Sequence, residues 1–121
     1  MYRSPEDIYS NFINKKISKK EALSQLMRLV ESVSDFKIKV KSIEIIVKFE
    51  DKSKNLFNFL ENYLISDENE FIRATAAKTI AFCFPKKAVK PLKWAKRHET
   101  SPLVLKTLED LFKDFEEIYF K

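Results

Sequence analysis

An internal repeat constrains the fold of this chain more than any other feature of its sequence. Residues 56–81 have the pattern of one helical hairpin, and weaker copies lie on either side at spacings of about 31–34 residues. Since repeated hairpins bury their apolar faces by stacking, the repeat predicts the architecture before any single motif does. A backward shift of 34 residues aligns two apolar sets: Ala22, Leu23, Leu26, Leu29 and Val30 with Leu56, Phe57, Leu60, Tyr63 and Leu64.

Glycine is absent from all 121 residues, although average usage near 7% predicts roughly eight. Phosphate-binding loops, dinucleotide-binding motifs and nucleophile elbows need glycine for close backbone approach or positive φ. Tight Asn-Gly hairpin turns are missing as well, which argues against an antiparallel β architecture. The composition therefore favours an all-α chain whose helices are joined by short polar turns.

The remaining composition indicates a folded chain of one domain's length. Apolar residues make up 45% and charged residues 34%, and no apolar run approaches the length of a membrane span. A single cysteine, Cys83, cannot form an internal disulfide, which fits a reducing compartment. The first residues carry acids and lack the apolar region of a secretory signal. We expect a cytoplasmic protein with no membrane partner.

Capping signals predict where the helices begin. Ser4 precedes a proline and two acids, and Ser18 with Glu21 forms a capping box. The predicted helices cover residues 5–14, 19–31, 36–49, 53–65, 69–82, 86–96 and 102–119. Pro91 lies inside the sixth of these, where it should kink or shorten the helix.

The segment 36–49 is ambiguous between helix and strand. Its first half alternates apolar and basic residues with a period of two, and β-branched residues add to the strand interpretation. We expect a helix, because this segment occupies the position that residues 68–84 fill in the next copy.

The middle copy resembles the HEAT repeat, in its short HEAT-like variety. The residues that carry the resemblance are Leu60, Leu64, Asp67, Ile72, Arg73, Ala76, Ala77, Ile80 and Ala81. In that family, the aspartate and the arginine form a hydrogen-bonded ladder between stacked copies, which implies this structural role for Asp67 and Arg73. Val33 and Lys39 stand at these positions in the first copy, and His98 and Val104 in the third. A tetratricopeptide alternative lacks its glycine and tryptophan pattern.

The resemblance implies a short right-handed α-solenoid of about three antiparallel hairpins with an extra N-terminal helix. Copies are expected at about 19–50, 53–84 and 86–113, within one domain of residues 1–121. The N-terminal helix would cover 5–14, and a C-terminal extension 114–121.

No group of residues predicts catalysis. His98 is the only histidine and has no nearby cysteine or aspartate, so a surface position is more common for it than metal binding or base catalysis. Cys83 lies between two phenylalanines, which favours packing over nucleophilic chemistry. Helical-repeat DNA glycosylases are a further class, but no motif of theirs is present. We expect a protein that is not an enzyme and has no cofactor or metal.

The first functional hypothesis is a non-catalytic interaction module or scaffold. In HEAT-type stacks the second helix of each hairpin lines the concave surface, so the resemblance places a partner-binding face there. Phe71 and Phe82 are separated by three helical turns on one side, amid basic residues, and suit an acidic peptide or partner helix. The alternative is that neighbouring hairpins cover both. The expected face comprises Phe71, Thr75, Lys78, Phe82, Lys37, Lys41, Lys48 and Lys106.

The second hypothesis is nucleic-acid binding. The net charge is +5, and residues 85–97 contain six basic residues and no acid. We name Lys86, Lys90, Lys93 and Arg97 the basic stripe, since a helix at 100° per residue places them within a sector of about 80°. Trp94 borders the stripe, as in surfaces that follow a phosphate backbone. The alternative is a solvated face of an amphipathic helix.

The C-terminal segment carries an apolar row that needs a partner surface. Either the row folds back over the third hairpin, or it makes the chain a homo-oligomer, because solenoid ends are otherwise polar. Its members are Leu108, Leu111, Phe112, Phe115, Ile118 and Tyr119.

Overall fold

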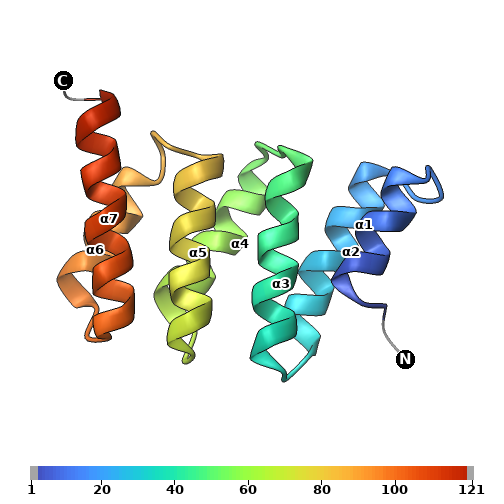
Figure 1. The fold of residues 1–121 in the computed structure, drawn as a ribbon, viewed down its shortest axis with the longest axis horizontal. Coiled ribbons are helices and arrows are strands. Elements are labelled where there is room, and N and C mark those ends of the chain that lie inside the picture. Colours follow the sequence, from blue (N-terminus) through green and yellow to red (C-terminus); the bar gives the residue numbers. More distant parts are fainter. Residues whose placement is uncertain (1–2, 120–121) are drawn as a thin grey trace. The chain divides into compact units, whose positions relative to one another are not determined.

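The computed structural model describes residues 3–119, with the side chains of residues 3–115. Within that range every regular element is helical (Figure 1), which confirms the all-α prediction and the helix at residues 36–46. The elements are α1 (Pro5–Ile13), α2 (Lys19–Ser32), α3 (Phe36–Ile46), the 3-10 turn η1 (Val47–Phe49), α4 (Lys54–Ser66), α5 (Glu70–Cys83), α6 (Val89–His98) and α7 (Pro102–Tyr119).

The chain divides into two compact units, unit 1 (Met1–Asp51) and unit 2 (Lys52–Lys121). The division falls between the first and second predicted copies of the repeat. The two units are described separately below.

Polar side chains begin most of the helices, as the sequence predicts. The hydroxyl oxygens of Ser4 and Ser18 each accept a hydrogen bond of 3.1 Å from the backbone N–H three residues later. The Asn69 side chain accepts from Phe71 and Ile72, at 2.8 and 3.3 Å. Each bond satisfies an N–H that has no acceptor within the helix. These caps define the helix starts in a chain without glycine.

Unit 1 packs α1, α2 and α3 against one another. Its fully buried apolar side chains are Ala22, Leu26, Val30, Ile43 and Ile46. Phe49, from η1, lies 4.8 Å from the ring of Phe12 and meets Tyr9 edge-on at 5.7 Å. The Lys48 ammonium stands 4.8 Å from the Tyr9 ring centre, so η1 is held against α1 by aromatic and cation–π contacts.

Unit 2 consists of two helical hairpins, α4–α5 and α6–α7. The second helices α5 and α7 pack side by side, and α4 and α6 form a layer behind them (Figure 1). Small residues along α5, among them Ala76 and Ala77, are completely buried and let the neighbouring helices approach closely. The largest fully buried side chains of this unit are Leu56, Leu60, Leu64, Ile72, Ile80, Leu92, Val104 and Leu108.

Helix α6 begins later than predicted. Residues 85–88 form a turn, and the helix starts at Val89 instead of Lys86, so Pro91 is its third residue. The first four N–H groups of a helix have no intrahelical acceptor, and a proline there removes no hydrogen bond. The predicted shortening is therefore confirmed, and Lys86 lies outside the helix.

Helix α7 continues through the predicted extension as far as Tyr119. The side chains of Ile118 and Tyr119 lie outside the described residues. In the described part of the apolar row, Leu108 and Phe115 are buried, while Leu111 and Phe112 are partly exposed. The row thus packs within unit 2 at least as far as Phe115.

Candidate functional site

The strongest polar interaction in unit 2 joins its two hairpins. The Arg73 guanidinium donates from Nε to Glu99 Oε2 at 3.0 Å and from Nη2 to Glu99 Oε1 at 2.9 Å. The same guanidinium donates from Nη1 to the backbone oxygens of Asp67 and Glu68, at 2.8 and 3.0 Å. Because one planar group bonds both inter-helix turns, Arg73 fixes the end of α4 against the start of α7.

This ion pair is largely shielded from water. The side chains of Arg73 and Glu99 are only 16% and 7% exposed. The hydrogen bond from Arg73 to Glu99 is the main cause that raises the pKa of Arg73. Desolvation alone would raise the pKa of Glu99, but hydrogen bonds from Arg73, Ser101 and Thr100 outweigh it and lower that pKa. Both groups therefore stay charged at neutral pH.

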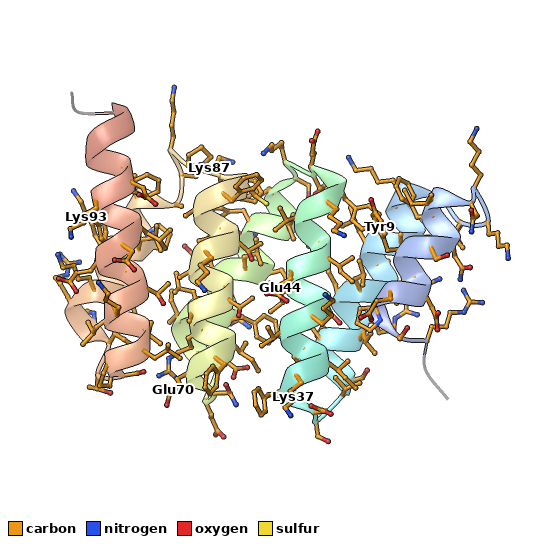
Figure 2. The ribbon with its side chains drawn as sticks, in the orientation of Figure 1. Tyr9, Lys37, Glu44, Glu70, Lys87 and Lys93 are labelled. Atoms are coloured by element: carbon orange, nitrogen blue, oxygen red, sulfur yellow. The ribbon has the colours of Figure 1, made fainter. Side chains whose placement is uncertain are left out.

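The predicted ladder of Asp67 and Arg73 has a different geometry from the one expected. Arg73 contacts the backbone oxygen of Asp67, whereas the Asp67 carboxylate accepts from the N–H of Asn69 at 2.8 Å. The carboxylate that pairs with Arg73 is Glu99, which sequence reasoning missed as a partner. A signal existed, since the 31-residue shift places Glu99 on Glu68, within the equivalent turn. A second bond between the two hairpins, over 31 residues, runs from Ser101 Oγ to Glu70 Oε1 at 3.2 Å; Glu70, labelled in Figure 2, begins α5.

The outer face of α5 exposes both predicted phenylalanines. Phe71 is 50% and Phe82 is 68% exposed, and Lys78 between them is exposed as well. We name Phe71, Lys78 and Phe82 the α5 row, since steps of 100° place all three within about 40° of one another. The two phenylalanines are 11 residues apart, or about 16 Å along the helix axis.

Thr75 does not belong to this accessible face. It is only 9% exposed, and its hydroxyl donates to the backbone oxygen of Phe71 at 2.8 Å. Its direction lies about 40° from Phe71 and about 20° from the exposed Phe82, so the helical position alone does not account for its burial.

The other residues of the predicted partner face are exposed lysines. Lys106, on α7, forms a surface ion pair of 3.2 Å with Asp110, so its charge is locally compensated. Lys37, Lys41 and Lys48 belong to unit 1, where all three are exposed.

The basic stripe is exposed along its whole length. Lys90, Lys93 and Arg97 lie on α6, Lys86 lies in the turn before it, and Lys93 points away from α5 (Figure 2). The ion pairs described in unit 2 join Arg73 to Glu99 and Lys106 to Asp110, and neither includes a residue of the stripe. The four cations of the stripe consequently have no carboxylate within ion-pair distance in that part of the chain.

The two remaining cations of residues 85–97 contact aromatic rings. The ammonium of Lys87 lies 5.7 Å from the Phe57 ring centre, and that of Lys96 lies 5.3 Å from that of Phe112. These contacts hold two lysine stems against α4 and α7 and separate them from the stripe.

Trp94 and His98 form a stacked pair at the end of α6. Their ring centres are 4.0 Å apart with an angle of 17° between the planes. His98 Nδ1 lies 2.9 Å from the backbone oxygen of Trp94, which orients the imidazole. Trp94 is 37% exposed and His98 is exposed. The pair borders a hollow of about 280 Å³ that Leu64, Arg73 and Glu99 also line.

The residues considered for catalysis differ in exposure. Cys83 is buried, whereas His98 is exposed beside Trp94. No helix within residues 3–119 combines the length and apolar character needed to cross a bilayer.

No family model, curated protein or solved structure matches this chain. The HEAT-like resemblance therefore stays a prediction.

Proposed function

We propose that this chain is a non-catalytic helical-repeat module that binds a protein partner through the α5 row. The observation that carries the proposal is the exposure of Phe71 and Phe82 on one side of a single helix. Large apolar side chains in contact with water gain most from association, and aromatic residues dominate the energy of protein interfaces.

The spacing of the row indicates the chemistry of the partner. An amphipathic helix with two apolar residues about three turns apart would cover both phenylalanines. A carboxylate between those residues would meet Lys78. Each ring exposes on the order of 100 Å² or more. Burying that area would contribute about 2–3 kcal/mol to the binding free energy, before the entropy lost on ordering the partner is subtracted.

The proposal includes a short right-handed α-solenoid of HEAT-like type. The bond from Ser101 to Glu70 and the pair of Arg73 with Glu99 support it, since both link the inter-helix turns of successive hairpins in unit 2. In such a stack the α5 row would belong to the partner-binding side of the second helices.

The test is partner capture from the native host with three variants. Phe71→Ala and Phe82→Ala should each lose the same captured protein and keep the melting temperature within a few degrees. Leu103→Ala is the matched control, because Leu103 is an exposed apolar residue of the same unit, at 36%. Retention of the partner by both phenylalanine variants would refute the proposal. A fall in stability comparable to that of a core substitution would instead assign the rings to packing.

A further inference from the structure

A second exposed surface of unit 2 comprises the basic stripe and the stacked Trp94–His98 pair beside it. We propose that α6 binds single-stranded nucleic acid, with Lys90, Lys93 and Arg97 on the phosphates and the Trp94–His98 pair stacked on a base. This surface is distinct from the α5 row, and the inference does not rest on the proposed protein partner.

The surface around α6 is strongly basic. Residues 85–97 contain six basic residues and no acid. The cations of the stripe are exposed, and among the described residues no carboxylate neutralises them. Uncompensated charges of one sign held on a helix attract a polyanion and release its counterions when it binds.

The cations on α6 are spaced along one side of the helix. Lys90, Lys93 and Arg97 follow one another at intervals of three and four residues, so their side chains leave the same side of α6. The distance from Lys90 to Arg97 along the axis is about 10 Å, which is long enough for the three cations to contact successive phosphates of one strand. Lys86 lies in the turn just before the helix and can contact a further phosphate.

The stacked pair favours a single strand over a duplex. Trp94 lies at the position between Lys90 and His98 on the helix, next to Lys93, and its ring is 37% exposed. His98 covers part of that ring with nearly parallel planes and is itself exposed, so a base can extend the stack. Bases inside a duplex do not present their faces for such stacking, whereas unpaired bases do.

The chemistry of the cations predicts weak sequence preference. Three of the four residues of the stripe are lysines, which act as point charges and lack the planar fork that arginine presents to guanine. The same surface accepts RNA or DNA, since phosphate contacts and base stacking do not require a 2′-hydroxyl.

The binding test uses fluorescein-labelled oligothymidylate and oligouridylate, with fluorescence anisotropy as the measurement. Both strands should bind at low salt, and log K should fall with log salt with a slope of about −2 to −3, from three or four phosphate contacts at −0.7 each. A labelled duplex should bind less tightly than either strand. Unequal binding of the two single strands would separate RNA from DNA as the preferred ligand within the same proposal.

Two variants test the named residues. Lys93→Gln combined with Arg97→Gln should reduce the salt slope by about 1.4, at about 0.7 per lost contact. Trp94→Leu should weaken binding about 5- to 100-fold, as expected for the loss of one stacked base. The control is Lys15→Gln combined with Lys16→Gln, which removes the same net charge from unit 1 and should leave affinity nearly unchanged.

Intrinsic fluorescence gives an independent readout, because Trp94 is the only tryptophan of the chain. Binding of either strand should change its emission if a base stacks on the pair. The proposal is overturned if neither strand binds at low salt, if the control pair reduces affinity as much as the stripe variant, or if Trp94 emission is unaffected by saturating strand. Binding only to vesicles of anionic and neutral phospholipid would also overturn it and assign the stripe to a membrane surface.

Discussion

Removing Arg73 is the most informative perturbation of this fold. The substitution Arg73→Met keeps the aliphatic volume and deletes a guanidinium that makes four hydrogen bonds, two to Glu99 and two to the backbone at the end of α4. Glu99, with its side chain 7% exposed, then remains as a buried carboxylate without a cation. We expect a large loss of stability for this reason.

The magnitude follows from burial. Breaking a fully buried ion pair by removing one partner costs about 3–5 kcal/mol. Arg73 is 16% exposed, and Glu99 keeps the N–H groups of Thr100 and Ser101 at 3.2 and 3.1 Å. A loss of about 2–3 kcal/mol is therefore expected, equivalent to a fall in melting temperature of about 10–20 °C for a unit of this size.

A double-mutant cycle isolates the contribution of the pair. Glu99→Gln retains an oxygen acceptor and loses the charge, so it should cost about 1–2 kcal/mol, and the coupling between the two substitutions should exceed about 1 kcal/mol. Urea unfolding followed by circular dichroism measures each variant. The exposed pair of Lys106 and Asp110 is the internal control, because its side chains are 67% and 58% exposed and its loss should cost less than about 0.5 kcal/mol.

The pH dependence has a definite sign. The pKa of Glu99 is lowered from 4.5 in the folded chain. Pairing of Glu99 with Arg73 therefore stabilises the fold fully above pH 4.5, and this stabilisation is lost as the pH falls through the folded pKa. The difference in stability between the wild-type chain and Glu99→Gln should accordingly be full at neutral pH and shrink in acid below about pH 4.5. The reasoning is refuted if Arg73→Met costs no more than the exposed control, or if this difference does not change with pH.

Two further predictions concern backbone strain and assembly. Glu50 has φ of 52°, in the left-handed region that glycine adopts without strain. Glu50→Gly should therefore leave the free energy of unfolding unchanged or raise it by up to about 1 kcal/mol in thermal unfolding, because relief of strain offsets the entropy cost of glycine. A clear loss of stability would show that the glutamate side chain is needed. Since Leu108 and Phe115 are buried within unit 2, the chain should sediment as a monomer, whereas a dimer that Leu111→Gln dissociates would restore the apolar row as an interface.

Local signals made the helices predictable from the sequence. The caps at Ser4 and Ser18 depend on residues within one turn, so the amino-acid pattern alone defines them. The predicted start of α6 lies three residues before the observed one, because the apolar and basic periodicity runs through the turn at residues 85–88. Pro91 was the better guide, since its ring is tolerated only in the first turn.

The contacts between hairpins were harder to predict. Glu99 lies 26 residues from Arg73, and only the packing of α5 against α7 brings their charges together. The burial of Thr75 likewise depends on the surroundings of α5, whereas the exposure of Phe71 and Phe82 matched the helical pattern. Periodicity identifies the apolar and polar sides of a helix, but which neighbours cover each side depends on tertiary packing.

The position of the single tryptophan has a consequence for how the two units can be followed during unfolding. Trp94 belongs to unit 2, whereas circular dichroism records the helices of both units. If the chain unfolds in one cooperative step, the two signals will change at the same denaturant concentration. If the units unfold separately, the tryptophan signal will follow residues 52–121 alone. The part of the circular dichroism change that does not coincide with the tryptophan transition will then give the stability of unit 1 without any label or truncation.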